Sequence, residues 1–151
     1  MIIAEQPRQI ERTELEGLVP HKGRMFLLDR FVSWSFEAGT FVAEAVVDSS
    51  CPFFDEGRGG VPVWVALEYM AQGIAAFSGV ERREAGPKIG FVMSVRDFKS
   101  GLRSFPAGAR VRIEARKLMR DGKVVSFACS AECGGAVTTA IINAIETDMN
   151  P

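Results

Sequence analysis

Histidine, cysteine and long apolar runs are scarce in this chain. Of its 151 residues, one is histidine and three are cysteine. The cysteines, Cys51, Cys129 and Cys133, have none of the spacings of a zinc site and form no even set for a disulfide framework. If Cys129 and Cys133 share a strand, they lie about 13 Å apart, too far for a disulfide bond. These absences argue against a disulfide-stapled secreted domain and favour a reducing cytoplasm.

The sequence also lacks the marks of a targeting or membrane segment. Its first residues, 1–8, have no basic start followed by a long apolar run, so we expect no secretory signal. The most apolar stretch, 62–77, is interrupted by Glu68 and Gln72, so we expect no membrane span. The net charge is −1 and 47% of the residues are hydrophobic. This balance is typical of a globular protein with one domain, 1–151, and gives no sign of nucleic-acid binding.

Positive charge is concentrated in one part of the chain. Between Arg96 and Lys123 there are nine lysine or arginine residues against three acidic residues. A solvated face would explain this run, and so would a docking surface for an acidic partner. Both interpretations are open at this point.

Apolar periodicity predicts two strands, then one long helix, then four strands. A short helix is expected before them at 13–19, capped by Thr13 with Glu16 as its capping-box partner. The expected strands are 25–36, 40–48, 88–98, 110–119, 125–133 and 136–145, with a turn at 105–108, and the long helix runs from Pro62 to about Gly79. This order predicts an α+β protein with one sheet around one central helix.

Glu68 lies in the middle of this apolar helix. Burying an ionised carboxylate there costs several kcal/mol unless something compensates. A carboxyl group in apolar surroundings stays protonated to higher pH and can work as a general acid near neutrality. The alternative is a carboxylate on the one wet stripe of the helix. Because few positions around the helix are polar, we favour the acid.

Two sequence motifs surround the expected hairpin and the start of the helix. The first is Leu18-Val-Pro-His-Lys-Gly-Arg-Met-Phe-Leu-Leu-Asp-Arg30, and the second is Pro52-Phe-Phe followed by Val61-Pro-Val-Trp-Val-Ala-Leu-Glu-Tyr-Met-Ala-Gln72. They resemble the Leu-Pro-His-Arg, Phe-Leu-Leu-x-Asp-Arg, Pro-Phe-Phe and Glu-Ala-Met-Ala-Gln runs of the bacterial β-hydroxyacyl-acyl carrier protein dehydratases. The resemblance extends by element order from about Thr13 to Thr147. It implies the hotdog fold, a curved antiparallel sheet wrapped around one long central helix.

One loop departs from that family. The family's catalytic histidine lies in a Gly-His-Phe-Pro-Gly loop, where this chain has the shorter Asp55-Glu-Gly-Arg-Gly-Gly60. The only histidine here is His21. The chain therefore resembles a divergent branch of predicted 3-hydroxyacyl-carrier-protein dehydratases, which includes those associated with aryl polyene synthesis.

The resemblance implies roles for residues on the helix and in the N-terminal motif. Glu68 would protonate the departing hydroxyl group or hold the water. His21 matches the family's N-terminal histidine. It serves as the base only if its loop approaches Glu68. Otherwise it is a structural residue that holds this loop in place by hydrogen bonds. Gln72 shares a helix face with Glu68 and either orients the carboxyl group or satisfies internal backbone groups.

The start of the helix and the preceding loop carry the other candidates. Backbone N–H groups near Val63 and Trp64 lack helical partners, and one of them would stabilise an enolate oxygen. The Trp64 ring lines an acyl tunnel or packs in the core. Asp55 and Glu56 are solvated or, in a thioesterase, supply the attacking carboxylate.

The resemblance also implies the substrate and the partners. We expect a 3-hydroxyacyl thioester on acyl carrier protein, a dimer of hotdog chains, no metal and no resident cofactor, because phosphopantetheine arrives on the carrier. Three functions are open: a dehydratase of fatty-acid or polyene-type biosynthesis, a non-catalytic or half-catalytic subunit beside a histidine-bearing hotdog chain, and an acyl thioesterase.

Overall fold

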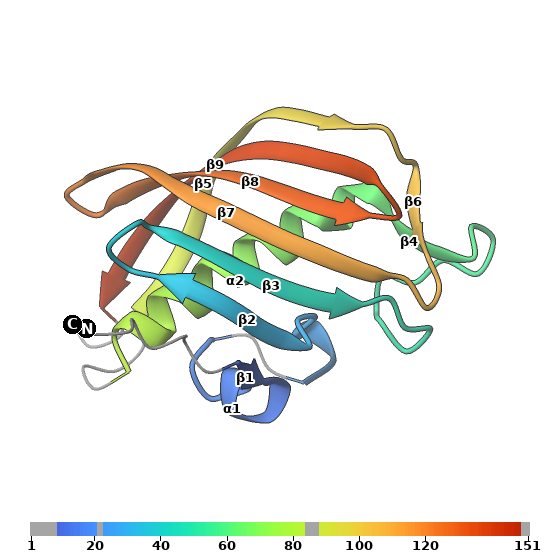
Figure 1. The fold of residues 1–151 in the computed structure, drawn as a ribbon, viewed down its shortest axis with the longest axis horizontal. Coiled ribbons are helices and arrows are strands. Elements are labelled where there is room, and N and C mark those ends of the chain that lie inside the picture. The colour runs from blue at the N-terminus through green and yellow to red at the C-terminus, as the bar shows by residue number, and fades with distance from the viewer. Residues whose placement is uncertain (1–8, 21–22, 84–87, 149–151) are drawn as a thin grey trace, which may run out of the picture.

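The chain forms an antiparallel sheet that arches over one long helix (Figure 1). The computed structural model describes residues 9–20, 23–83 and 88–148, and only the backbone of residues 88–91, 147 and 148. The helical elements are α1 (Arg12–Glu16), the 3₁₀ turns Gly23–Met25 and Val63–Val65, and α2 (Ala66–Glu81). The strands are β1 (Ile10–Glu11), β2 (Arg30–Ser35), β3 (Thr40–Val46), β4 (Gly60–Pro62), β5 (Lys88–Ser100), β6 (Ser104–Pro106), β7 (Arg110–Asp121), β8 (Val124–Cys133) and β9 (Ala136–Asp148).

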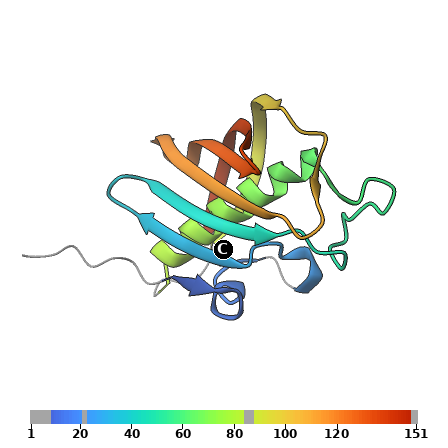
Figure 2. The same ribbon diagram turned by 45° about the vertical axis from the view of Figure 1, so that its right-hand side comes forward.

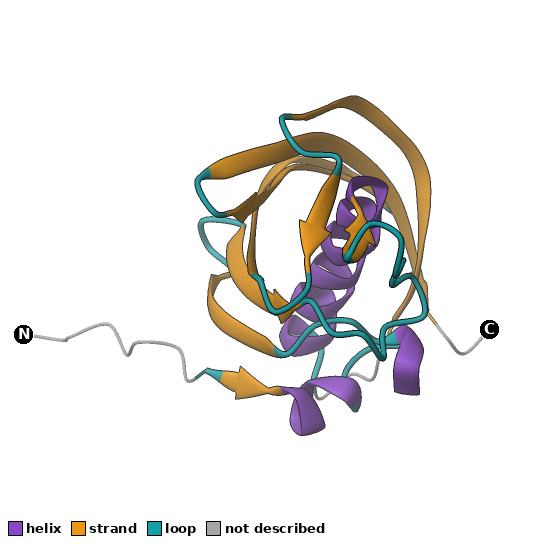
Figure 3. Cartoon of the chain, turned by 90° about the vertical axis from the view of Figure 1, so that its right-hand side faces the viewer, coloured by secondary structure: helices purple, strands orange, loops and turns teal. Residues whose placement is uncertain are grey.

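The seven strands of the main sheet follow the order β1-β2-β3-β7-β8-β9-β5, and every neighbouring pair is antiparallel. The strand that follows the helix, β5, therefore lies at the far edge of the sheet, beside β9. Viewed from the side, the sheet curls around α2 (Figures 2 and 3). This is the hotdog fold expected from the sequence. The short strands β4 and β6 form a separate pair at the end where α2 begins.

The inner face of the sheet packs on α2 as the alternation of β8 predicts. Its five odd-numbered positions are all buried: Val125, Phe127, Cys129, Ala131 and Cys133. The ring of Phe41 on β3 lies 5.5 Å from that of Phe77 on the helix. A Cβ atom at Gly73 would lie 2.6 Å from the Phe41 ring, so the helix approaches the sheet this closely only because residue 73 is glycine.

One stripe of the helix remains partly uncovered. Trp64, at the helix start, is 52% exposed. The other residues of the stripe are half-buried and follow at helical spacing: Leu67, Glu68, Ala71, Ala75 and Ser78. The segment Val63–Glu81 is long and apolar enough to cross a membrane, but 67% of it is buried in the protein, as in the core helices of soluble proteins. The uncovered stripe marks the side of the helix that the sheet does not reach.

Three local expectations from the sequence are wrong. The first helix begins after Glu11 without a side-chain cap, and Glu16 accepts a hydrogen bond from the Gly23 N–H at 2.8 Å instead of closing a box with Thr13. Residues 25–29 are not part of a strand, because this segment turns to bond with the helix. The expected turn at 105–108 begins instead as β6, whose residues pair with β4.

Candidate active site

The start of the central helix is fixed by the two short strands. Pro62 on β4 pairs with Ser104 on β6, and the Val63 N–H donates to the Arg103 carbonyl at 2.9 Å. The expectation that Val63 offers a free backbone donor is therefore wrong, because its N–H group already donates to the carbonyl of Arg103. The next N–H groups, beginning with that of Trp64, belong to the first turn, where intrahelical acceptors are lacking. Trp64 is thus the better placed of the two predicted donors.

The Trp64 side chain stands at the surface beside a second aromatic ring. It packs edge-on against Phe53, with ring centroids 5.5 Å apart. Phe53 belongs to the loop between β3 and β4 and is itself half-buried. Two aromatic rings next to the helix start form an apolar surface suited to an acyl chain or to another protein chain.

Glu68 lies one helical turn after Trp64, in the first turn of α2. It is half-buried and makes no hydrogen bond or ion pair with any described residue. A carboxylate in the first turn interacts favourably with the helix dipole. The structure places Glu68 on the uncovered stripe of the helix, as the alternative interpretation expected, and its oxygen atoms are not bonded to any described residue. Its role as an acid stays a prediction. A carboxyl group in this state is able to exchange a proton with a bound molecule.

Gln72 lies one further turn along the helix and is completely buried. Its Oε1 accepts a hydrogen bond from the Leu27 N–H at 2.7 Å, and its Nε2 donates to the Met25 carbonyl at 2.8 Å. These two bonds match the interpretation in which Gln72 satisfies internal backbone groups. The side chain joins the N-terminal motif to the helix that carries Glu68.

The loop that lacks the family's histidine forms a tight turn. Asp55 Oδ1 accepts a hydrogen bond from the Gly57 N–H at 2.9 Å, and Oδ2 pairs with Arg58 at 3.4 Å. The Asp55 backbone pairs with that of Gly60. Glu56 is exposed. Both carboxylate oxygens of Asp55 therefore stabilise the loop. This argues against the interpretation in which Asp55 is the attacking carboxylate of a thioesterase. His21 lies outside the described residues, so its predicted role stays a prediction.

Tyr69 was not predicted from the sequence, although it follows Glu68 directly. Its side chain is 2% exposed and lines a cavity of about 740 Å³ between the N-terminal segment and the loop after β3. Its hydroxyl group makes no hydrogen bond with any described residue. Burial raises the pKa of Tyr69, and the negative potential of Cys51 and Asp29 raises it further, so the phenol remains a hydrogen-bond donor. An unpaired tyrosine hydroxyl is visible only in three dimensions, because its isolation depends on chain segments far apart in sequence.

The described residues contain no group of three or more histidine, cysteine, aspartate or glutamate side chains that could hold a metal ion. All three cysteines are free. Glu68, the helix start and the aromatic pair beside it form the candidate site.

Comparison with known proteins decides the family. The family model for ApeP-like proteins, described as ApeP dehydratase, matches residues 13–151. The chain belongs to the ApeP-like dehydratase family. No curated protein matches this ApeP-like chain.

Solved structures agree with this family. A chain of the dehydratase heterocomplex ApeI:P from Xenorhabdus doucetiae is 25% identical, with a TM-score of 0.80, over 89% of this chain and 91% of that one. The phenylacetic acid degradation protein PaaI from Thermus thermophilus is 16% identical, with a TM-score of 0.58, over 81% and 94%. A hypothetical thioesterase from Streptococcus pneumoniae, solved with coenzyme A, is 12% identical, with a TM-score of 0.56, over 74% and 80%. The last two likenesses show the hotdog fold alone.

Proposed function

We propose that this ApeP-like chain is a subunit of a 3-hydroxyacyl-thioester dehydratase that acts on acyl chains carried by acyl carrier protein. The proposal rests mainly on the position of Glu68. Its carboxyl group lies half-buried on the central helix and is not bonded to any described residue. The family, whose model is described as a dehydratase, supports the reaction class. We infer the carrier protein and the fatty-acid or polyene-type pathway from the resemblance of the two sequence motifs to those of the dehydratase family.

In this reaction a base removes the α-proton of the 3-hydroxyacyl thioester. The electron pair forms the double bond as the 3-hydroxyl group leaves, and Glu68 gives that group the proton with which it departs as water. The products are a trans-2-enoyl thioester and water. During proton removal, negative charge builds on the thioester oxygen, and the Trp64 N–H would stabilise it. His21 is the predicted base, because an imidazole exchanges protons readily near neutral pH.

We further propose that a second hotdog chain completes the site. β5 ends the main sheet, and no described strand lies on its outer side. It carries four exposed apolar side chains: Val92, Met93, Val95 and Phe98. A strand edge of this length and composition is suited to pairing with another strand. The uncovered stripe of α2 and the loop without histidine fit the same partner, and the similar X. doucetiae protein is itself solved in a heterocomplex.

Much of the basic stretch is already engaged within the chain. Three of its arginines pair with carboxylates, and Lys117 lies over the Phe77 ring. Arg103 is one of the cations of this stretch that have no acidic partner among the described residues. It is exposed, and it lies beside the helix start, since its carbonyl accepts the Val63 N–H beside Trp64. We propose Arg103 as a contact for the acidic carrier protein, next to the helix start where the phosphopantetheine arm would enter.

The experiment is hydration of a trans-2-enoyl thioester, followed by loss of enoyl absorbance, with thiol release recorded in the same sample. The chain is tested alone and after co-expression with a histidine-bearing hotdog chain. Hydration without thiol release in either sample supports the dehydratase, and activity only in the mixture assigns the missing base to the partner. Thiol release without hydration would replace the proposal with a thioesterase. No reaction in either sample would reduce this chain to a non-catalytic subunit.

A further inference from the structure

The cavity of about 740 Å³ beside Tyr69 has no part in the proposed reaction. It lies between the N-terminal segment and the loop after β3, and its volume is typical of a small-molecule site. Glu68, Trp64 and Phe53 are not among the described residues that line it. What this cavity binds is therefore a separate question from the chemistry of Glu68.

Hydrogen bonds join the two walls of the cavity to each other. Arg24, on the N-terminal wall, donates from two nitrogen atoms to the Ser50 carbonyl on the other wall, at 2.9 and 3.3 Å. The Asp29 carboxylate, also on the N-terminal wall, accepts a hydrogen bond from the Val46 N–H at 2.6 Å. These bonds hold the walls at a fixed separation, so the cavity exists before any ligand arrives.

The charges around the cavity are of both signs. The described lining includes two cations and three anions: Arg12, Arg24, Glu16, Asp29 and Asp48. Each of these side chains makes at least one hydrogen bond to a backbone group. A charged ligand would lie beside like charges as well as opposite ones, which is unfavourable. The lining therefore favours an uncharged ligand.

The Tyr69 hydroxyl group is a buried polar group without a partner. The side chain is 2% exposed, and its hydroxyl group bonds to no described residue. Its oxygen atom is not completely enclosed by protein, so it faces the space of the cavity that the residue lines. Because burial raises the pKa of Tyr69, the phenol keeps its proton and is a donor. Buried tyrosine hydroxyl groups usually have a hydrogen-bond partner, so a ligand oxygen would satisfy this one.

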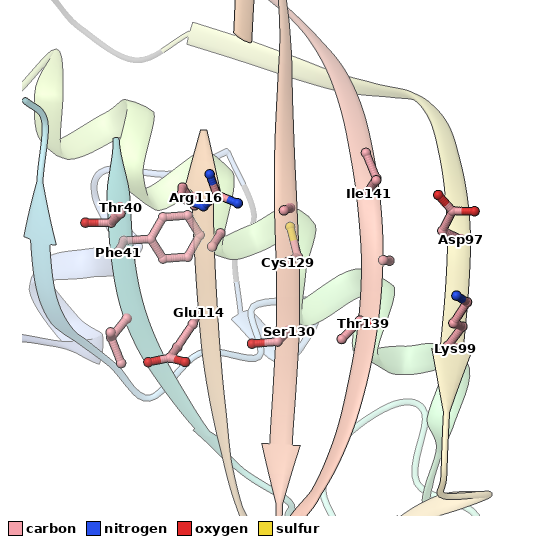
Figure 4. A pocket seen from close by; sticks show the side chains of 14 residues that line it. Thr40, Phe41, Asp97, Lys99, Glu114, Arg116, Cys129, Ser130, Thr139 and Ile141 are labelled. Carbon is pink, nitrogen blue, oxygen red and sulfur yellow. The ribbon is translucent and has the colours of Figure 1, made fainter. Parts of the chain in front are cut away.

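The cavity on the outer face of the sheet differs in this respect. Its volume is about 620 Å³ (Figure 4). Its charged and hydroxyl side chains, among them Glu114, Arg116 and Ser130, are all at least partly exposed, so water satisfies them. Of these two cavities, the one beside Tyr69 alone contains a buried hydroxyl group without a partner among the described residues.

We propose that the cavity beside Tyr69 binds an uncharged molecule with an apolar body and an oxygen atom, such as that of a ketone, that accepts a hydrogen bond from the Tyr69 hydroxyl group. The apolar body would lie against Phe26 and Leu27, which are buried and line the same cavity. Such a molecule is either the far end of an acyl chain or a separate small ligand. The first of these sources rests on the proposed dehydratase, and the second does not.

The test compares two compounds of the same shape. Acetophenone has a ketone oxygen, and α-methylstyrene has a methylene group in its place. Tyr69 is the only tyrosine of the chain, so labelling with isotope-enriched tyrosine gives the ring signals of one residue in an NMR titration. The titration uses the labelled chain together with whichever hotdog partner it binds. Acetophenone should shift these signals and bind about fivefold more tightly than α-methylstyrene, a difference equal to one neutral hydrogen bond.

Tyr69→Phe removes the hydroxyl group and keeps the ring. Binding to this variant is measured by protection of Cys51 from iodoacetamide, because Cys51 is a half-buried free thiol that lines the cavity. Acetophenone should bind about fivefold more weakly than to the wild type, and α-methylstyrene should bind equally. Ser130→Ala, which removes a hydroxyl group from the other cavity, is the matched control and should change neither affinity.

Equal affinities of the two compounds for the wild type would overturn the proposal, as would an absence of binding or an unchanged acetophenone affinity in Tyr69→Phe. The enoyl hydration assay in the presence of acetophenone distinguishes the two sources. Slower hydration identifies the far end of the acyl chain as the ligand, and an unchanged rate identifies a separate molecule. The affinities themselves are measured without any reaction, so their outcome is independent of whether the chain is a dehydratase.

Discussion

Gln72 and Leu27 are joined by a buried hydrogen bond of 2.7 Å that ties the N-terminal motif to the central helix. The same side chain bonds to Met25, so one amide satisfies two backbone groups of the segment that links the 3₁₀ turn Gly23–Met25 to β2. We expect Gln72→Leu to lower the free energy of unfolding by about 3 kcal/mol, because it leaves the buried Leu27 N–H and the partly buried Met25 carbonyl unpaired. Urea unfolding measures this loss. The exposed Gln9→Leu makes the same chemical change and should cost almost nothing; equal losses would contradict the assigned role.

Glu68→Gln removes the proton donor and keeps the shape of the side chain. We expect the hydration rate to fall by about 10²-fold or more, with an unchanged unfolding midpoint, because general acid catalysis contributes on that scale. Glu81→Gln is the matched control, since Glu81 is exposed at the other end of the same helix. A Glu68→Gln variant that hydrates at the wild-type rate would remove Glu68 from the mechanism.

His21→Ala tests whether the single histidine is the base. If His21 removes the α-proton, the variant should lose turnover far beyond any loss of stability, and the pH dependence of the remaining rate should lose the limb that reports imidazole titration. The rate and the thermal unfolding curve are measured on the same preparation. A variant with unchanged rates returns His21 to a structural role and leaves the base to a partner chain.

Arg103→Glu tests the proposed contact with the carrier protein. The exposed side chain should matter for an acidic protein and not for a small substrate. We therefore expect kcat/KM to fall about tenfold for an acyl chain on carrier protein and to stay the same for the corresponding pantetheine thioester. Lys123→Glu, the same change of charge at the β7–β8 turn, should have little effect. A loss with both substrates would show that Arg103 acts on the helix start instead.

Cys129 makes stability depend on pH in the alkaline range. Burial raises the pKa of its thiol from about 9 to about 12, so in the folded protein the thiol keeps its proton while the unfolded chain loses it. The stabilisation is complete below pH 9 and is lost as the pH rises toward 12. Wild type and Cys129→Ala, unfolded in urea at pH 8 and pH 10, should differ most at pH 8. A difference that does not change with pH would mean that the thiol contributes only by packing.

The sequence predicts the large elements because their patterns are local. The alternation in β8 identifies the inward residues from Val125 to Cys133, and the apolar run after Pro62 identifies the central helix. β4 and β6 are missed because each has three residues, and only their pairing with each other makes them strands. The same pairing explains why the Val63 N–H is occupied: its acceptor, the Arg103 carbonyl, is forty residues away in the chain.

For the candidate site, too, the sequence predicts the features that depend on a local pattern and misses those that depend on distant segments. Glu68 stands out because a carboxylate is rare in such an apolar helix. Gln72 had two possible roles at the sequence level, since either one fits an amide a turn after Glu68, and only the positions of Met25 and Leu27 distinguish them. The cavity around Tyr69 is formed by segments 12–29 and 46–51, which lie far from residue 69 in the sequence, so no local pattern reports the isolation of its hydroxyl group.

The outer edge of β5, beside which no described strand lies, has a consequence for the cell that makes this protein. A strand with unpaired backbone groups and exposed apolar side chains accepts any other strand that reaches it first, the correct partner or another unfolded chain. If the proposed second hotdog chain covers this edge, copies synthesised in excess of that partner would be lost to aggregation or proteolysis. The amounts of the two proteins, and the timing of their synthesis, would therefore have to be matched.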